Sequence, residues 1–295
     1  MAKKKPSAKN KKSTKKAAKA GRVISLIRLG KPAKKNGKIT FLSLYKWNVG
    51  LAALHLLQGI VIIILSKAST LPVTTHFLTT DTLATQTAGH PVLAVAVRHL
   101  FDVNLAYLVA AFFFMSAIAH LVVATVYRKR YEANLKTGIN KTRWIEYGIS
   151  ASTMMVAIGL LGGIYDLSSI IMIITLVFIM SMMGLVMEVH NQSAKKTNWL
   201  SYIIGCVAGI IPWVVFTIYV KGAYMYGSGK IPAFVYWIYA SMFVLFASFA
   251  INMFLQYRRK GKWADYLYGE RIYMILSLVA KTALAWQIFA GTLRP

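Results

Sequence analysis

The chain has 295 residues, of which 57% are hydrophobic, and its mean hydropathy is +0.54. Length alone would suggest roughly two soluble domains, but so apolar a composition is typical of a membrane protein. The net charge of +27 is concentrated at the N-terminus, where 16 of the 35 Lys and Arg residues precede Trp47. Charge gathered in one tail is weak support for nucleic-acid binding, so we expect no nucleic-acid partner. The single cysteine, Cys206, excludes an intramolecular disulfide and a multi-cysteine metal site.

The first forty residues are rich in lysine and poor in apolar residues. Such a segment buries too little surface to fold, so we predict that 1–40 form a disordered, basic cytoplasmic tail. The tail either binds anionic membrane lipid, at about 1 kcal/mol per cation near the surface, or serves only to fix the topology. The remaining residues, 41–295, form the predicted transmembrane domain.

Seven stretches are long enough for a helix that crosses a hydrocarbon core about 30 Å thick, which takes about 20 apolar residues. They are 47–66, 100–127, 142–163, 167–188, 199–220, 232–257 and 264–290. The predicted fold class is therefore an all-α membrane protein, a seven-transmembrane helix bundle. The Thr-rich segment 67–99 is too polar to span and too long for a simple turn, so we expect an extracellular loop with structure of its own.

The distribution of cations predicts the orientation, because cytoplasmic segments retain Lys and Arg. With the N-terminus inside, the inner segments hold 28 cations and the outer segments 5. Without the basic tail the split is still 12 to 5. We therefore predict a cytoplasmic N-terminus and an extracellular C-terminus.

Other residues in the spans suit packing and anchoring. The small-residue pattern Gly205 to Gly209 favours close helix approach, and Pro212 is tolerated as a kink. Four tryptophans near the predicted span ends are expected to be interfacial anchors: Trp144, Trp199, Trp237 and Trp263.

Lys281 lies in the middle of the seventh span, ten residues from both Arg271 and Gly291. At ~1.5 Å per residue it is ~15 Å from either flank, too far to reach water easily. A charge in hydrocarbon costs at least ~2.5–3.5 kcal/mol, so this lysine is expected to be neutral, paired or covalently modified. Burial of the amine favours Schiff-base formation with a carbonyl compound. An ion pair that serves packing alone is the simpler alternative.

A protonated Schiff base needs a carboxylate nearby, and the chain has only eight acidic residues. Seven of them fall in loops or near span ends, which leaves Glu146 as the expected counterion. Ser277 lies one turn before Lys281, so its hydroxyl is placed to bridge the two. The alternative for Glu146 is a solvated acid that pairs with Arg143. Because Glu146 is only about one turn inside the third span, we expect that helix to begin before residue 142.

Two histidines, His55 and His120, interrupt otherwise apolar helices about eight and seven residues from the inner ends of their spans. Both therefore reach the half of the membrane from which Glu146 enters. The pair suits a buried proton acceptor or a hydrogen-bond network. For either histidine alone, a plain interhelical hydrogen bond explains its presence equally well.

Several short motifs surround these ionisable residues. They are SLVAKTALAWQ at 277–287, GKWADY at 261–266, GER at 269–271, RWIEY at 143–147 and HLLQG at 55–59. Together they resemble the heliorhodopsin family, and the resemblance extends over 45–295.

The resemblance implies a retinal-binding photoreceptor with a cytoplasmic N-terminus, in agreement with the count of cations. Lys281 would carry all-trans retinal, Glu146 would be the counterion, and Ser277 would hydrogen-bond near the Schiff base. His55 and His120 would match the buried histidine pair of the family and form a polar network with Arg143. The implied retinal pocket contains Tyr147, Ser150, Met154 and Trp213.

The resemblance also implies partners and a location. We expect an integral multi-pass protein of the plasma membrane that forms a homodimer, contacts membrane lipid and acts on an unidentified cytoplasmic signalling partner. The family's dimer contact involves a small hairpin in the first loop, which here is longer than expected.

The leading functional hypothesis is a light sensor that isomerises retinal and changes shape without net ion transport. The alternative is a light-gated proton or ion conductance that uses Glu146 and Glu188. An N-inside seven-helix zinc hydrolase would need a cluster of His and Asp ligands. Only His55 and His120 fall inside the spans, so we expect neither an enzyme nor a metal site.

Overall fold

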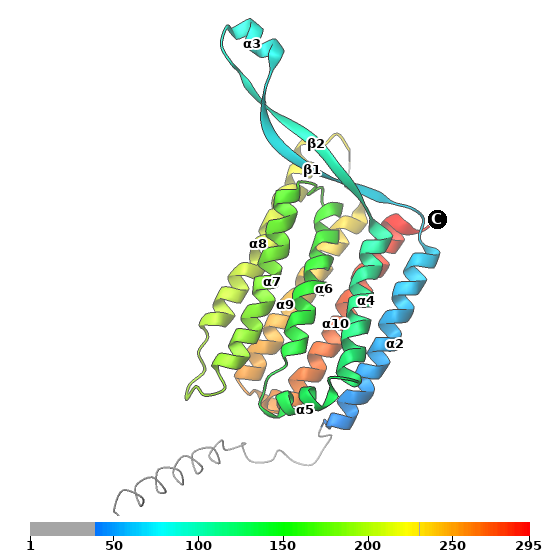
Figure 1. Ribbon diagram of the computed structural model, residues 1–295, viewed down its shortest axis with the longest axis vertical. Coiled ribbons are helices and arrows are strands. Elements are labelled where there is room, and N and C mark those ends of the chain that lie inside the picture. Colours follow the sequence, from blue (N-terminus) through cyan, green and yellow to red (C-terminus); the bar gives the residue numbers. More distant parts are fainter. Residues whose placement is uncertain (1–38, 230) are drawn as a thin grey trace, which may run out of the picture. The chain divides into compact units, whose positions relative to one another are not determined.

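The computed structural model describes residues 39–229 and 231–295 (Figure 1). Within these residues, 7 helices are long and apolar enough to cross a membrane, which confirms the predicted number. They are α2 (Phe41–Leu65), α4 (Leu105–Ala124), α6 (Lys141–Leu161), α7 (Leu167–His190), α8 (Leu200–Tyr226), α9 (Ala233–Tyr257) and α10 (Tyr266–Ile288). A π-helical turn, η2 (Phe289–Leu293), continues α10. Seven apolar helices that satisfy their own backbone hydrogen bonds are what a lipid environment requires.

The predicted basic tail lies almost wholly outside the described residues. Its last two positions belong to the folded part, because Ile39 is buried and the side chain of Thr40 caps α2 by accepting from the Ser43 amide. The first helix therefore begins before the predicted position 47, at Phe41.

Polar side chains set the start of most of the long helices. An N-cap oxygen accepts one of the amide protons that a helix leaves unpaired in its first turn. Five of the seven helices have such a cap: Thr40, Asn104, Asn140, Asp166 and Asp265. The helix starts are thus encoded locally, in residues that hydropathy alone does not single out.

The loop after α2 forms a β-hairpin, so the expectation that it has its own structure is met. Strand β1 (Thr70–Thr80) pairs antiparallel with β2 (Leu93–Asn104), with Thr80 opposite Leu93 near the tip, where α3 (Thr82–Ala88) joins the strands. Because β2 extends to Asn104, the prediction that the second span begins at residue 100 is wrong. Extended pairing with β1 holds those residues out of the helix.

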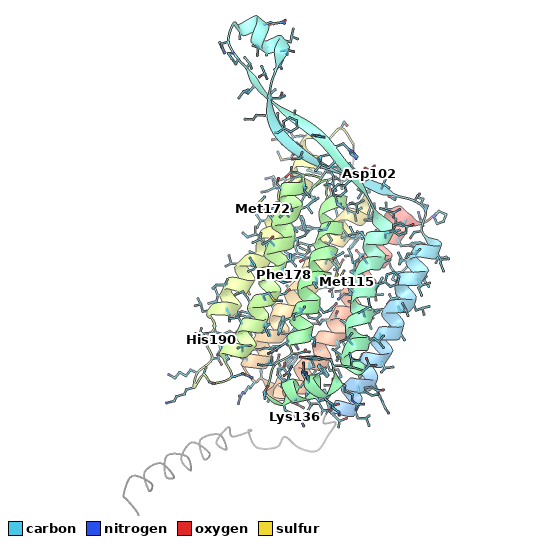
Figure 2. All side chains as sticks on the ribbon, viewed as in Figure 1. Asp102, Met115, Lys136, Met172, Phe178 and His190 are labelled. Atoms are coloured by element: carbon cyan, nitrogen blue, oxygen red, sulfur yellow. The ribbon has the colours of Figure 1, made fainter. Side chains whose placement is uncertain are left out.

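The base of the hairpin is attached to the turn between α6 and α7. The Thr74 amide donates to the Tyr165 carbonyl at 2.8 Å, and His76 Nδ1 lies 3.2 Å from Asp166 Oδ1. Burial alone would raise the pKa of Asp166, but hydrogen bonds from Ser169 and His76 hold it below its usual value. The rest of the hairpin extends away from the helices and exposes apolar side chains (Figures 1 and 2).

A short helix, α5 (Arg128–Lys136), covers the opposite end of the bundle (Figure 1). It buries Tyr131 and Leu135 and leaves its basic residues toward the outside. Figure 2 marks this end by Lys136 and His190 and the hairpin side by Asp102. We call the two ends the α5 end and the hairpin end.

Two glycines of the bundle permit close contacts that a side chain would prevent. A Cβ on Gly184 of α7 would lie 2.3 Å from the Trp144 ring, and a Cβ on Gly209 of α8 would lie 2.5 Å from Met180 Sδ. The small-residue pattern on α8 therefore serves packing against α7, as predicted.

Candidate functional site

Lys281 lies inside the bundle, on α10. Its side chain is 3% exposed, and it is the only buried lysine among residues 39–229 and 231–295. The amine donates to Ser277 Oγ at 2.8 Å and lies 3.2 Å from Glu146 Oε1. The three residues singled out from the sequence are thus in direct contact.

Glu146 reaches this position from α6. Its other close partner is Ser116 of α4, whose hydroxyl donates to Oε1 at 2.5 Å. Arg143 contacts other acids instead, so the alternative of a solvated Glu146 paired with Arg143 is wrong. Two opposite charges with a pair of hydroxyl groups form a compact, nearly neutral unit, which is how an ion pair persists in a low dielectric.

Lys281 lies in the middle of its span, whereas Glu146 lies near the start of its own. The lysine side chain covers most of this difference in depth. Helix α6 begins at Lys141, only one residue before the predicted start, so an earlier helix start does not account for the contact. A helical side chain leans toward the N-terminus of its own helix. Since α10 and α6 both begin at the α5 end, Lys281 leans toward that end and meets Ser277 and then Glu146 (Figure 1).

A largely apolar cavity opens beside the Lys281 amine, between α6, α7, α8, α9 and α10. Three of the four predicted pocket residues line it: Tyr147, Ser150 and Met154. Trp213 does not line it but packs edge-on against Phe246, which does. The structure therefore brings the α6 residues to the cavity directly and places Trp213 one layer behind its wall.

The two histidines lie side by side next to this unit. Their rings stack with centroids 5.7 Å apart, and His120 Nδ1 lies 2.8 Å from Asn48 Oδ1. Both ring nitrogens of His55 are buried without a protein partner.

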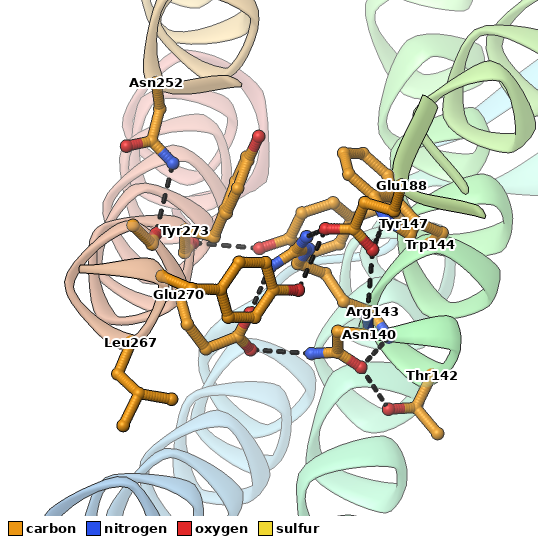
Figure 3. A network of polar contacts seen from close by, with 12 residues as sticks. Asn140, Thr142, Arg143, Trp144, Tyr147, Glu188, Asn252, Leu267, Glu270 and Tyr273 are labelled. Atoms are coloured by element: carbon orange, nitrogen blue, oxygen red, sulfur yellow. Dashed lines mark hydrogen bonds and ion pairs between the residues drawn. The ribbon is translucent and has the colours of Figure 1, made fainter. Parts of the chain in front are cut away.

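Arg143 forms a separate buried cluster nearer the α5 end (Figure 3). Its guanidinium binds the carboxylates of Glu188 on α7 and Glu270 on α10. Trp144 also belongs here, because its indole donates to Glu188 at 2.7 Å and its side chain is buried. The prediction that Trp144 is an interfacial anchor is therefore wrong, since the carboxylate gives its N–H a partner inside the protein.

Sequence reasoning did not find this cluster. It placed Glu188 and Glu270 near span ends, used Glu188 only for the alternative conductance, and grouped Arg143 with the histidines. The signal that could have found it is the scarcity of acidic residues. In a chain with only eight of them, two at the depth of an intramembrane arginine suggest that they pair with it. Nearby Tyr131 of α5 also belongs to this buried environment, which raises the pKa of its hydroxyl well above the usual value.

The residues at the cavity fit an aldehyde-bearing apolar ligand such as retinal. Lys281 supplies a buried primary amine, and Glu146 and Ser277 supply a carboxylate and a hydroxyl group at that amine. The remaining wall is mostly aromatic, aliphatic and thioether side chains, which suit a polyene and its ring. Such an amine can form a covalent bond to a carbonyl carbon that lies in the cavity.

Solved structures with the same fold include two microbial rhodopsins. The light-driven proton pump LR (Mac) from Leptosphaeria maculans has 16% identity and a TM-score of 0.56, and the match covers 84% of this chain and 94% of that one. Cyanorhodopsin N4075R from the cyanobacterium Tolypothrix sp. NIES-4075 has 13% identity and a TM-score of 0.54, covering 87% and 96%. At such low identity the similarity concerns the fold alone. No curated protein matches the chain at a significant level.

The family is decided by sequence. The heliorhodopsin family model matches residues 44–293, which include nearly all of the folded part, the hairpin and the Lys281 motif. The chain therefore belongs to the heliorhodopsin family and is a retinal-binding rhodopsin of the membrane.

Proposed function

We propose that the protein is a light sensor in which Lys281 binds all-trans retinal, Glu146 is the counterion, and light drives a conformational change without net ion transport. The observation that carries the proposal is the buried Lys281 amine, which faces an apolar cavity 3.2 Å from the Glu146 carboxylate. An N-inside orientation is part of the proposal and is supported by the excess of cations in the segments at the α5 end.

When bound to Lys281 as a protonated Schiff base, retinal supplies visible absorption and a light-driven isomerisation. The side chains of the protein do the rest. Glu146 holds negative charge next to the Lys281 nitrogen and so stabilises a proton there. Ser277 and Ser116 hydrogen-bond to the two members of this pair and fix their separation. A change in position of the Lys281 nitrogen would therefore weaken a buried ion pair whose two members have few other polar partners.

His120 and His55 offer the nearest place for a displaced proton. His120 lines a small cavity together with Glu146, and its ring is stacked on that of His55. Both imidazoles are within helices that contact α6 or each other, so added charge on either would alter interhelical contacts. In the proposed function this change is the signal.

The direct test is to add all-trans retinal to the expressed protein and to record the visible spectrum. We expect a coloured pigment for the wild type and none for Lys281→Ala. Lys221→Ala is the matched control, because Lys221 is exposed on α8 and should leave the pigment unchanged. A normal pigment in Lys281→Ala would overturn the attachment site.

A light-gated proton or ion conductance is the second candidate, and one observation favours it. Several polar side chains line the small cavity beyond Glu146, which extends to Arg143 and Glu270 of the Arg143 cluster. Voltage-clamp recording separates the two functions. A light-induced current that reverses with voltage supports the conductance, whereas its absence supports the sensor.

A further inference from the structure

The Arg143 cluster has more acids than bases. Arg143 is the only cation that binds Glu188 and Glu270 among the described residues, and all three side chains are at most 4% exposed. If both carboxylates were ionised, the cluster would hold one uncompensated negative charge in a low dielectric. Such a charge is costly, and the usual outcome is that one of the two acids stays protonated.

Glu188 has the surroundings of an ionised carboxylate. Besides Arg143, three donors point at it: the Tyr266 hydroxyl at 2.9 Å, the backbone N–H of Asn140 at 2.8 Å and the Trp144 indole N–H at 2.7 Å. The last two have no acceptor role, and each oxygen receives two donors. A carboxylate has about four lone-pair sites, and at Glu188 three of them face groups that can only donate, so the ionised form is the better satisfied one.

Glu270 has fewer hydrogen-bond donors around it, and one of them is a hydroxyl group that can also act as an acceptor. Oε2 accepts from Arg143, and Oε1 accepts from Asn140 Nδ2 at 2.6 Å. The remaining neighbour is the Tyr131 hydroxyl, 3.3 Å from Oε1. A hydroxyl group accepts as readily as it donates, so Tyr131 can receive a hydrogen bond from a protonated Glu270.

We propose that Glu270 carries a proton while Glu188 is ionised, so that the Arg143 cluster is a proton-binding site separate from the Lys281–Glu146 pair. In this state Arg143 and Glu188 are the charged pair, and the Glu270 O–H donates to Tyr131. The assignment concerns the protein's own residues and does not depend on retinal or on the proposed function.

The site is connected to the interior by the small cavity. This cavity has a volume of about 30 Å³, and Glu146, His120, Tyr131, Arg143 and Glu270 line it. The volume is enough for one or two waters, and the polar side chains among the lining residues can supply their hydrogen-bond partners. Glu270 is thus placed to exchange a proton, through water, with Glu146 and His120.

Several titratable or charged groups surround Glu270, and each bears on its protonation. They are Tyr131 of α5, Arg143 and Glu146 of α6, Glu188 of α7, His120 of α4, and Tyr266 and Tyr273 of α10 itself. The adjacent Arg143 guanidinium favours a charged Glu270, whereas the nearby Glu188 carboxylate and the burial of the group favour a neutral one. Because Glu188 already balances the charge of Arg143, the influences that favour a neutral Glu270 prevail.

Infrared spectroscopy of the retinal-free protein tests the proposal, because a carboxylic acid and a carboxylate absorb at different frequencies. At neutral pH the exposed acids are ionised, so we expect the wild type to show the C=O band of a buried carboxylic acid. Glu270→Gln should abolish this band. Glu132→Gln is the control and should retain it, since it removes an acid on the outside of α5.

Tyr131→Phe provides a second variant that leaves Glu270 in place. Loss of the hydroxyl removes the acceptor for the Glu270 proton, so the acid band should shift but persist. The proposal is overturned if the wild type lacks the band, if the band survives in Glu270→Gln, or if Tyr131→Phe leaves its frequency unchanged. The wild-type spectrum decides the first point even if Glu270→Gln does not fold.

Discussion

Two buried ionic groups lie in the same half of the bundle and differ in design. The Lys281 group has one cation and one carboxylate, two hydroxyl partners, and an apolar cavity beside the amine. The Arg143 cluster has one cation between two carboxylates, with donors from α5, α6 and α10 filling almost every oxygen. The first leaves a reactive amine accessible to a ligand, whereas the second uses an arginine that remains charged. The comparison teaches that burial of a charge does not by itself mark a reactive site; open space and a group that can lose its proton do.

The largest effect should come from removing the cation of the cluster. Arg143→Met leaves its carboxylates without a buried cation, and breaking such a pair costs about 3–5 kcal/mol. Lys281→Met should cost less, because Glu146 has only one oxygen in close contact with the lysine and borders a cavity that admits water. Thermal unfolding of the retinal-free variants measures both. Equal losses would show that the two groups contribute alike to folding.

Glu146→Gln should have the next largest effect, on the pigment rather than on folding. The variant removes the negative charge that stabilises the proton on the Lys281 nitrogen. We expect a strong shift of the visible band or loss of the protonated form near neutral pH, with Glu132→Gln as the exposed control. A spectrum unchanged between about pH 5 and about pH 9 would point to another counterion.

Ser277→Ala should have a smaller effect. Its hydroxyl bonds the Lys281 amine at 2.8 Å, but Glu146 still balances the charge. A single hydrogen bond contributes about 0.5–1.5 kcal/mol, or up to about 3 kcal/mol to a charged group. The pigment should therefore form, with a shift smaller than that of Glu146→Gln. A Ser277→Thr variant that keeps the hydroxyl should restore the wild-type spectrum; if it behaves like alanine, the hydroxyl is not the cause.

No effect is expected on transmembrane pH. Net proton pumping needs exchange groups on both sides of the Lys281 nitrogen. In the described residues, Glu146, Ser277 and His120 lie toward the α5 end, while the acids at the hairpin end, Asp81, Asp102 and Asp166, lie outside the membrane-spanning helices. A released proton should return by the route it took. Illuminated cells with and without a protonophore provide the measurement, and a sustained, protonophore-sensitive pH change would contradict the prediction.

Much of the fold was predictable from the sequence because the relevant physics is local. A helix in lipid satisfies its own backbone and must be about 20 residues long, so hydropathy alone predicts the seven spans. The helix ends were predicted less well, since they depend on caps such as Thr40 and Asn104. The start of the second span was placed too early. Pairing with β1, rather than composition, keeps residues 100–104 extended in β2.

The central contact was also within reach of the sequence. A lysine in mid-span is so costly that its partner must be one of few acids, and elimination leads to Glu146. What tertiary structure alone decided is which side chains meet across helices. Arg143, Glu188 and Glu270 come from α6, α7 and α10, and Tyr131 is brought to them by α5. Their pairing depends on the order and rotation of the helices in the bundle, which periodicity along one chain does not contain. For the same reason the cavity, formed by five helices at once, appears only in the folded protein.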